Sequence, residues 1–504
     1  MTGQTEEPLQ EARSIDLYPL PEGWKWVTVS DVGAHQKNAI VDGPFGSNLK
    51  VSDYVEDGPV PVLTTKNLEG KYENVRYITK EKFEELKRSA VYPGDILMAK
   101  IGSCGKTGIY PPNNPPAIIP ANLLKVSLND QFELKYVYYY FNSSFFQEAL
   151  RTITKATAQP AFGVTNFRKL PLPCTTRDQQ QLIASEIDKQ FSRLDEAVAN
   201  LKRVKANLKR YKAAVLKAAV EGKLTEDWRK AHPNVDPASK LLERILAERR
   251  AKWTGRGQSN QPGDPEISNL PQLPDKWLWA RLDAIASLKG GITVDKNRKS
   301  PTARTVPYLR VANVQRGHLD LSEIKTIEAP DTDIKDLRLI PGDILFNEGG
   351  DRDKLGRGWL WEGQLTECIH QNHVFRARLY LAEVSPKLVS WWGNSFGQAY
   401  FSREGKQTTN LASLNLSKLS AFPVPLPPAA EQQQIVVEVE RRLSVLEKLE
   451  AAVEANLTRA ARLRQSILQQ AFSGRLLSAS TRSPSLKTSK GAAAETSSYG
   501  SSIR

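Results

Sequence analysis

The sequence predicts an α+β protein in which two globular domains are joined by two long antiparallel coiled-coil helices, with an internal pseudo-two-fold axis. Three observations lead to this prediction. The chain repeats its own motifs, the first part of each repeat is rich in β-forming and turn residues, and the second part has the apolar spacing of a long helix. The 504 residues are enough for about three folded units.

The duplication is visible in motifs that return about 250 residues later. Leu20–Trp26 (LPEGWKW) matches Leu273–Trp279 (LPDKWLW), and Pro93–Leu97 (PGDIL) returns unchanged as Pro341–Leu345. The offset drifts across these motifs but is constant from Pro171 onward, where the matched pairs are Pro171 with Pro423, Glu186 with Glu438, Leu194 with Leu446 and Gly222 with Gly474. A period this long indicates a duplicated module whose loops differ in length while its helices match.

The first part of each module has short β-rich runs separated by Gly and Pro turns. The predicted strands are Val60–Thr64, Asp95–Ala99, Ile118–Val126, Val306–Val311, Asp343–Phe346 and Asn372–Leu379. Helical patches at Leu134–Thr154 and Pro386–Arg403 interrupt them. We therefore predict α+β domains at residues 15–175 and 269–427, each large enough for its own core.

The second part of each module, residues 176–224 and 428–476, predicts a long helix, at Arg177–Val220 and Ala430–Phe472. Apolar residues recur there at steps of three, four or seven, which is typical of a coiled-coil seam. The seam residues include Ile187, Phe191, Leu194, Leu201 and Leu208 in the first helix and Val439, Leu443, Leu446 and Leu463 in the second. Neither helix can bury this stripe alone, so we expect the two to pack together. Each would be about 65 Å long at 1.5 Å per residue and would hold the two domains far apart.

The remaining segments are expected to be less regular. Residues 225–268 form a linker with a short amphipathic helix at Ser239–Lys252 and a flexible Gly/Ser/Gln/Pro run at Gly255–Pro265. Residues 1–14 and 477–504 are predicted to be disordered.

Charge and cysteine content narrow the class of protein. Lys+Arg 70 against Asp+Glu 56 gives a net charge of +14, which permits a polyanionic partner without choosing one. Three cysteines, Cys104, Cys174 and Cys368, cannot form a disulfide framework, which favours a reduced cytoplasm. No apolar stretch is long enough to span a membrane, and Met1–Arg13 is too polar for a signal peptide.

Two fragments resemble motifs of nucleotide binding and methyl transfer without matching them. Gly102–Thr107 has two residues between its glycines, whereas a phosphate loop has four. Asn114–Ala117 (NPPA) lacks the aromatic residue that stacks on a flipped base. We interpret the first as a basic turn after a strand and the second as a proline-rich surface loop.

The sequence also gives little support for a metal site or for a pair of catalytic acids. Cys368, His370 and His373 are close in sequence, but in an alternating strand His373 points away from the other two. Asp331 and Asp333 share a single turn, unlike the acids of a nuclease, which come from separate strands. With five histidines in the chain, no catalytic triad can be built, and we predict neither a catalytic residue nor a metal site.

Basic, turn-rich loops are the candidates for nucleic-acid contact. Lys and Arg suit phosphate groups, whereas Asn, Gln and Arg suit base edges. The candidate residues are Lys66, Asn67, Lys71, Lys100, Lys106, Lys289, Lys296, Arg298, Lys299, Arg310, Arg352, Lys354 and Arg357. Ala197–Val220 adds seven basic residues and no acid, which would also fit a solvated helix face.

Together these motifs resemble the specificity subunit of type I restriction-modification systems. The resemblance rests on the two LPxxWxW starts, the two PGDIL strands, and the two helices that open near Asp178–Gln180 and Glu431–Gln433 and end in Gly-Lys-Leu or Gly-Arg-Leu. It covers residues 20–476, and the first helix opening departs mildly, with Asp in place of Glu.

The resemblance implies that each domain is a target-recognition domain that reads one half of a gapped, asymmetric site in double-stranded DNA. The helices would set the unread gap and dock two modification subunits, which bind S-adenosylmethionine and methylate adenine. Two restriction subunits, which use ATP and Mg²⁺, would complete the complex. For this chain the resemblance implies no catalysis, no cofactor of its own and no membrane partner.

Two alternatives from other classes remain. A stand-alone DNA methyltransferase or nuclease with fused target domains would need a cofactor loop or an acid cluster. A coiled-coil scaffold that binds only protein would make the basic loops incidental.

Overall fold

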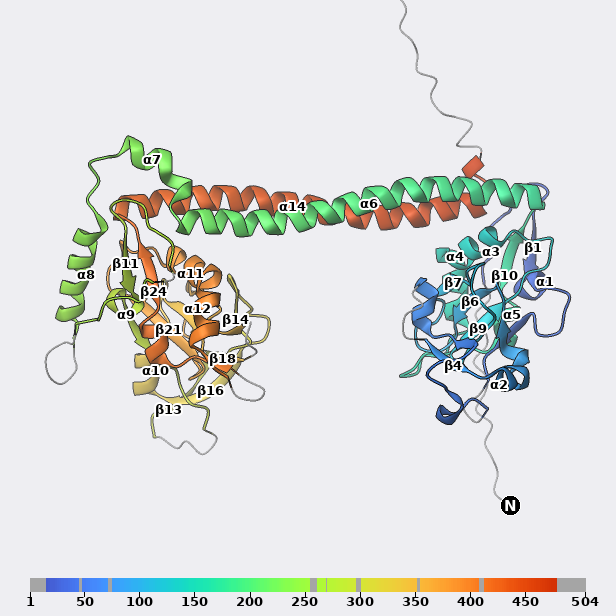
Figure 1. Cartoon of the computed structure of the whole chain (residues 1–504), viewed down its shortest axis with the longest axis horizontal. Coiled ribbons are helices and arrows are strands. Elements are labelled where there is room, and N and C mark those ends of the chain that lie inside the picture. The colour runs from blue at the N-terminus through green and yellow to red at the C-terminus, as the bar shows by residue number, and fades with distance from the viewer. Residues whose placement is uncertain are drawn as a thin grey trace, which may run out of the picture. The chain divides into compact units, whose positions relative to one another are not determined.

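The computed structural model describes residues 15–44, 48–70, 75–253, 261–268, 270–295, 301–350, 354–407 and 412–477. The chain forms two compact units: unit 1 contains Met1–Leu201 and Ala455–Arg504, and unit 2 contains Lys202–Glu454. Each unit is a mixed domain of helices and strands together with part of α6 (Arg177–Val220) and part of α14 (Ala429–Phe472), both 44 residues long (Figure 1). The predicted tails 1–14 and 477–504 lie outside the described residues except for Leu477, which is helical, and the first part of the run Gly255–Pro265 also lies outside them.

Unit 1 contains the following elements outside the long helices. Its strands are β1 (Lys25–Thr28), β2 (Ile40–Asp42), β3 (Val60–Val62), β4 (Arg76–Ile78), β5 (Ala90–Val91), β6 (Ile96–Ala99), β7 (Thr107–Ile109), β8 (Ala117–Ile118), β9 (Leu123–Val126) and β10 (Pro171–Cys174). Its helices are α1 (Val29–Val32), α2 (Lys80–Glu85), α3 (Leu134–Phe141), α4 (Ser144–Thr152) and α5 (Val164–Arg168), with 3-10 turns η1 (Val51–Asp53), η2 (Thr65–Glu69) and η3 (Lys87–Ser89).

Unit 2 is built from a similar set. Its strands are β11 (Leu278–Arg281), β12 (Ala286–Lys289), β13 (Ala303–Leu309), β14 (Val314–Gln315), β15 (His318–Leu319), β16 (Lys325–Pro330), β17 (Ile344–Asn347), β18 (Gly349–Gly350), β19 (Gly358–Leu360), β20 (Ile369–His370), β21 (Val374–Leu379), β22 (Lys406–Gln407), β23 (Ala412–Ser413) and β24 (Pro423–Leu426). Its helical elements are η4 (Lys223–Thr225), α7 (Glu226–Ala231), α8 (Ala238–Ala251), α9 (Leu282–Ile285), α10 (Asp331–Leu337), α11 (Pro386–Ser395), α12 (Gly397–Glu404) and α13 (Leu416–Ser420).

The two domains share one framework. Each has a four-stranded antiparallel sheet with the PGDIL strand inside it, in the order β2-β9-β6-β7 in unit 1 and β12-β21-β17-β19 in unit 2. In each, the strand after the LPxxW motif pairs with the strand that precedes the long helix, β1 with β10 and β11 with β24. The predicted α+β class and the duplication of the module are confirmed.

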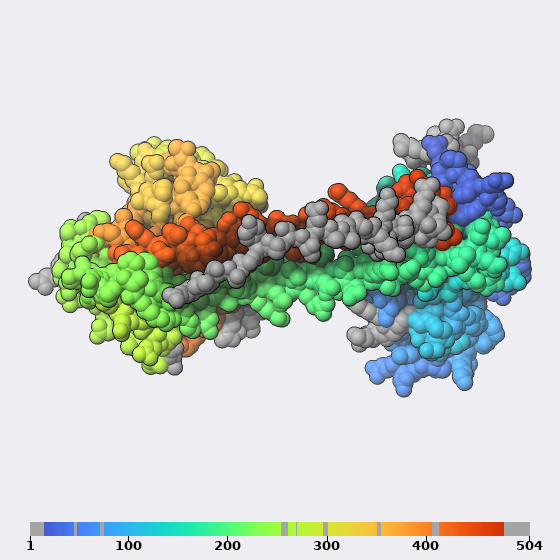
Figure 2. Space-filling view, turned by 90° about the horizontal axis from the view of Figure 1, so that it is seen from above, coloured from blue at the N-terminus to red at the C-terminus, as the bar shows by residue number. Residues whose placement is uncertain are grey.

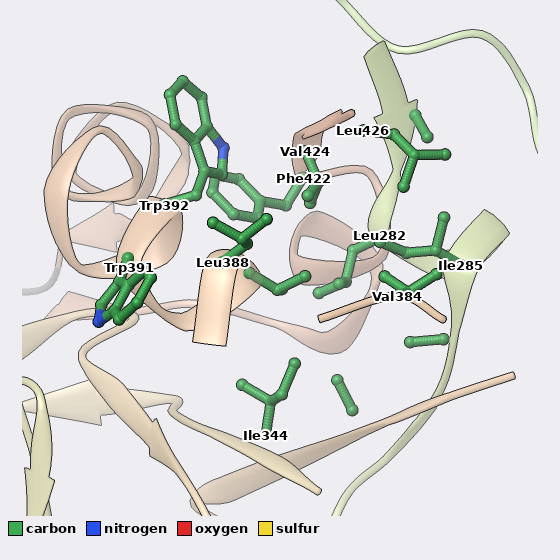
Figure 3. Close-up of a cluster of buried hydrophobic side chains, with 14 of the residues drawn as sticks. Leu282, Ile285, Ile344, Val384, Leu388, Trp391, Trp392, Phe422, Val424 and Leu426 are labelled. Atoms are coloured by element: carbon green, nitrogen blue, oxygen red, sulfur yellow. The ribbon is translucent and has the colours of Figure 1, made fainter. Parts of the chain in front are cut away.

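The core of unit 2 lies between α11, α9 and the strand β24 (Figure 3). The indole of Trp392 lies close to Phe422, and Leu388 of the same helix points toward Leu282 of α9. The end of α6 and the start of α14 add side chains to this core: Ala219, Val220, Ile435 and Val439.

The core of unit 1 is richer in aromatic residues. Tyr136 and Tyr140 of α3 each lie edge-on to the Phe472 ring of α14, with centroids 5.2 and 5.1 Å apart. Ile183 and Ile187, near the start of α6, are buried in the same cluster. Both domains therefore bury apolar side chains against both long helices.

In each unit α14 (orange to red) lies against α6 (green) (Figures 1 and 2). In unit 1 the Arg464 guanidinium lies 4.1 Å from the Phe191 ring centroid and pairs with Asp195, while Phe472, later in α14, shares a core with Ile187, earlier in α6. In this unit the two helices therefore run antiparallel.

The same direction holds in unit 2. Lys205 Nζ lies 2.7 Å from Glu454 Oε2, and Val220, later in α6, shares a core with Ile435, earlier in α14. The predicted antiparallel packing of the helices is confirmed within each unit.

The seam between the helices is narrower than predicted. On α14 the buried positions follow a seven-residue period: Leu446, Val453, Ala460 and Ile467. Ile187, Phe191 and Val439 are also buried, and Leu194, Leu201, Leu208 and Leu443 are half-buried. Leu463 is 48% exposed, so its place in the seam is wrong. It lies beside the buried series, where α6 alone does not cover it.

Each long helix ends against an LPxxW motif. Gly222 and Gly474 have φ of +71° and +73°, the left-handed conformation that glycine adopts most readily after a helix. A Cβ on Gly222 would lie 2.5 Å from Pro274 Cγ, and a Cβ on Gly474 would lie 2.2 Å from Pro21 Cγ. The glycine and the motif repeat together because they form the two sides of one contact.

In unit 2 a buried carboxylate strengthens this junction. Glu431, in the first turn of α14, is 0% exposed. Its Oε1 accepts hydrogen bonds from Thr225 Oγ1 (2.7 Å) and Arg229 Nη1, and its Oε2 accepts one from Trp277 Nε1 (2.8 Å). The residues just after α6, the LPxxW motif and the start of α14 therefore meet at one group.

The glutamines at the helix openings attach each helix to its domain. Gln180 Oε1 accepts the backbone N–H at the start of α3 (2.9 Å), and Gln432 Oε1 accepts the one at the start of α11 (2.8 Å). Gln180 therefore matches Gln432, and Glu431 matches Gln179. The predicted pairing of the Asp178–Gln180 opening with Glu431–Gln433 is wrong by one residue, because it followed the letters and not these contacts.

The linker after α6 belongs to unit 2. Ala238, Leu241 and Ile245 of α8 are buried in the unit 2 core, and α8 begins one residue before the predicted helix. Figure 2 shows the green residues that follow α6 in contact with the rest of this unit. In the part of the chain that the structure describes, every helix is too short or too polar to cross a membrane.

We expect Glu431→Ala to lower the free energy of unfolding by about 3–5 kcal/mol, because it leaves the largely buried Arg229 guanidinium without its carboxylate. Denaturant unfolding of the full chain measures this. The matched control is Glu447→Ala, an exposed acid of the same helix, which should change stability by no more than about 0.5 kcal/mol. Equal effects of the two substitutions would contradict a structural role for Glu431.

Candidate nucleic-acid interface

The repeated PGDIL motif forms a turn with a buried acid. Asp343 accepts the Ile340 N–H (2.8 Å) and two hydrogen bonds from Arg378, through Nε and Nη2, both at 2.7 Å. Asp95 accepts the Tyr92 N–H (2.8 Å) and lies 3.6 Å from Lys125 Nζ. Both carboxylates are satisfied inside their domains, so the motif stabilises the framework and does not reach a ligand.

In unit 1 the candidate DNA contacts separate into surface and buried residues. Lys66 is exposed, and Lys106 pairs with Glu69 at the surface. Lys100 is 8% exposed, and its Nζ lies 2.6 Å from Asp42 Oδ2. A buried, paired ammonium cannot contact DNA without losing that partner, so the prediction for Lys100 is wrong.

Asn67 is a second correction. It is 4% exposed, and its Oδ1 accepts hydrogen bonds from the backbone N–H (2.6 Å) and hydroxyl (3.0 Å) of Thr64. Asn313 does the same in unit 2, where its Oδ1 accepts the Arg310 N–H at 2.9 Å. The repeated asparagine therefore closes a turn after β3 or β13 and does not read bases.

In unit 2 the described candidates already have partners. Lys289 pairs with Asp336, Arg310 Nη2 lies 3.4 Å from Glu323 Oε1, and Arg357 Nη2 donates to the Val311 carbonyl at 3.3 Å. Surface ion pairs are weak, so Lys289 and Lys106 can exchange their carboxylates for phosphates at small cost. Lys354 is half-buried. The remaining candidates lie outside the described residues: Lys71, Lys296, Arg298, Lys299 and Arg352.

The sequence fragments that were considered as nucleotide-binding or metal-binding sites lie in a turn and in a buried contact. Gly102 and Gly105 lie in the turn between β6 and β7, with φ of +80° and +85°. Burial lowers the pKa of His370 to about 4, so the ring stays neutral, and its Nδ1 lies 2.6 Å from the Val374 carbonyl. Among residues 15–477, leaving out the gaps given above, no three His, Cys, Asp or Glu side chains are grouped to hold a metal ion.

Each domain also carries a small set of paired segments that the sequence did not predict, which we call the finger. In unit 2 it is the sheet β18-β23-β22. In unit 1 it consists of residues 101–105 and 154–161, where Ile101 and Lys155 each form an antiparallel bridge to Ala161. The available signal was charge: no acid occurs between Glu148 and Asp178, a stretch that contains five basic residues.

Part of α6 presents a basic surface. In unit 2 Lys202, Lys209 and Arg210 are exposed, whereas Lys205 pairs with Glu454 of α14. One cation of the predicted basic segment, Lys205, is therefore neutralised by an acid near the middle of α14.

Comparison with known proteins identifies the class. The family model described as "Type I restriction modification DNA specificity domain" matches residues 21–210. The EcoKI type I restriction enzyme specificity subunit of Escherichia coli (strain K12) is 24% identical over 468 residues, covering 91% of this chain and 90% of that protein. The EcoEI specificity subunit of Escherichia coli is 22% identical over 498 residues, covering 87% and 80%.

A solved structure shares the fold. One chain from a structural study of complex assembly and conformational transition of the type I R-M system has a TM-score of 0.60 at 18% identity, covering 91% of this chain and 100% of that chain. Residues 21–210 match the DNA specificity domain, and the chain as a whole is similar to type I restriction-modification specificity subunits in sequence and in fold. The alternative of a stand-alone methyltransferase or nuclease is not favoured, since the relatives are named specificity subunits.

Lys66 and Lys100 give opposite expectations. Lys100→Ala should lower the free energy of unfolding by about 2 kcal/mol, because Asp42 loses a buried charged hydrogen bond. It should leave the salt dependence of duplex DNA binding unchanged. Lys66→Ala should leave stability unchanged and reduce the slope of log affinity against log salt by about one. If Lys66→Ala lowered the stability and Lys100→Ala changed the salt dependence instead, the assignment of Lys66 as exposed and Lys100 as buried would be refuted.

Proposed function

We propose that this chain is the non-catalytic sequence-recognition subunit of a type I restriction-modification complex, in which each domain reads one half of a gapped duplex DNA site. The observation that carries the proposal is the shared framework with different loops. Units 1 and 2 share the four-stranded PGDIL sheet and the strand pair beside each long helix, whereas their other sheets and the segments between strands differ in length and residue type.

The framework explains how two different half-sites can be read by one chain. A dimeric DNA reader uses two identical surfaces and therefore recognises a palindrome. Here the two domains are copies within a single polypeptide, so their exposed segments can differ while the buried junctions remain the same. An asymmetric, bipartite target is the form of DNA site that this duplication supports.

The long helices are the candidate docking surface for the catalytic subunits. Val437, Val445 and Leu449 of α14 are 60%, 51% and 48% exposed in unit 2, which suits contact with protein. We infer that two modification subunits, which bind S-adenosylmethionine and methylate adenine, dock here. Two restriction subunits that use ATP and Mg²⁺ would join the complex. We propose a cytoplasmic location, because the target of such an assembly would be chromosomal DNA.

Exchange of one domain tests the proposal. Replacing residues 20–170 with the corresponding domain of another family member should change one half of the methylated site and leave the other half unchanged. The measurement is sequencing of methylated adenines in the DNA of a host that expresses the hybrid with its modification subunits. The unaltered chain is the control. A change in both halves would refute separate reading by the two domains.

Shortening the helices tests their role in setting the gap. Deleting residues 198–204 and 455–461 removes seven residues from each helix between the Asp195–Arg464 and Lys205–Glu454 pairs. Seven helical residues span about 10 Å, so the unread gap should shorten by about three base pairs at 3.4 Å each. The same methylation sequencing gives the gap. An unchanged gap would mean that these helices do not set it.

A further inference from the structure

We propose that the finger of unit 1 reads base edges in its half-site, with Gln159 as a base-contacting residue and Lys155 as a neighbouring phosphate contact. This inference rests on the proposed function and assigns the contact to particular side chains. It replaces Asn67 and Lys100, which the structure places in buried contacts.

The finger loop is held in position by its backbone. The Lys155 N–H donates to the Ala161 carbonyl (2.9 Å), and the Gly102 N–H donates to the Pro160 carbonyl (2.8 Å). The Thr157 hydroxyl donates to the Gln159 carbonyl (2.8 Å) across the tip. A loop fixed in this way loses little conformational freedom on binding, which is the condition for side chains at its tip to discriminate between bases.

The exposed side chains of the loop have the chemistry of groove recognition. All five residues from Lys155 to Gln159 are exposed. A glutamine amide can donate and accept together, which matches the N6 and N7 groups of adenine, and a threonine methyl group can contact the methyl group of thymine. Lys155 supplies one positive charge beside them without an acid in the loop.

The charge around the finger favours a polyanion. Between Glu148 and Asp178 the basic residues are Arg151, Lys155, Arg168, Lys169 and Arg177. Arg168 Nη2 donates to the Ile40 carbonyl and Arg177 Nη1 to the Asp130 carbonyl, so these two guanidinium groups are held within the unit. Arg151, Lys155 and Lys169 are exposed. These exposed cations are available for contacts with phosphates of the bound DNA.

The matching finger of unit 2 supports a role in reading and not merely in folding. Its strand β23 lies between β18 and β22, as Ala161 lies between Ile101 and Lys155 in unit 1. The Leu414 N–H donates to the Glu348 carbonyl (2.7 Å), as the Phe162 N–H does to the Lys100 carbonyl (3.3 Å). The framework of the finger is thus repeated. The sequence between its last two strands is not repeated, since it reads Thr-Thr-Asn-Leu after Gln407 in unit 2 and Ala-Thr-Ala-Gln-Pro after Lys155 in unit 1.

The experiment measures binding of the full chain, in complex with its modification subunits, to duplexes in which each base pair of both half-sites is changed in turn. We expect Gln159→Ala to lose about tenfold to a hundredfold discrimination at one base pair of one half-site and to keep it at the others. Lys155→Ala should weaken binding to all duplexes equally, and Lys155→Arg should restore it, because the charge is retained. The matched control is Gln131→Ala, an exposed glutamine of the same unit near the start of α3.

Unchanged discrimination at every position in Gln159→Ala would overturn the assignment while leaving the proposed function intact. Equal loss at all positions of both halves would overturn it as well, because a base contact affects only its own position. A second variant, in which Ala156–Gln159 is replaced by Gly-Ser-Gly-Ser of the same length, must lose discrimination in the same half-site as Gln159→Ala. If the unaltered complex shows no preference at any position, the proposed function itself fails.

Discussion

The constraint on which the rest of this structure depends is that each domain completes its core with both long helices. The α3 aromatic residues of unit 1 pack on the start of α6 and the end of α14, and the α11 residues of unit 2 pack on the end of α6 and the start of α14. Burial of apolar surface contributes about 25 cal/mol per Å², so both ends of each helix are fixed by packing. An inserted residue would displace one of these contacts, which accounts for the constant offset between the copies along the helices.

A second level of organisation lies in how buried polar groups are used. Asp95, Asp343, Gln180, Gln432 and Glu431 are all enclosed, and each satisfies its oxygen atoms with groups of its own unit. Buried hydrogen bonds of this kind fix the orientation of the elements that they join. The residues that repeat between the copies therefore define the framework, and the residues that do not repeat occupy the exposed segments.

The sequence predicted the framework well because its signals are local. The first long helix has the predicted bounds Arg177–Val220, and the second begins one residue earlier than predicted, since apolar periodicity and terminal glycines mark helices directly. The Pro and Gly residues of the PGD motif likewise predicted a turn directly. Because the module is duplicated, each motif occurs twice. A motif that is weak evidence by itself became strong evidence when it recurred in the same order.

The candidate site was less predictable, for a physical reason. Whether a lysine is free to contact DNA depends on distant residues, and Lys100 meets Asp42, which is far from it in the sequence. Asn67 has a suitable side chain for a base edge, yet its local hydrogen bonds to Thr64 use that side chain. Leu463 fits the seam pattern but lies where the single opposing helix does not reach. In each case the pairing partner, and not the residue type, decided the outcome.

The two-part composition of unit 1 has a consequence for biosynthesis. Unit 2 is one continuous stretch of chain, whereas unit 1 needs Ile467, Leu468 and Phe472, which the ribosome adds some 330 residues after the aromatic residues of α3 that they cover. During translation the first domain therefore emerges first but completes its core last, with part of its apolar surface unpaired until α14 is made. A polypeptide truncated before α14 ends retains that exposed surface, which chaperones and proteases recognise. Only a polypeptide that includes α14 buries this surface and escapes degradation. The pairing of the two helices therefore also selects for full-length chains.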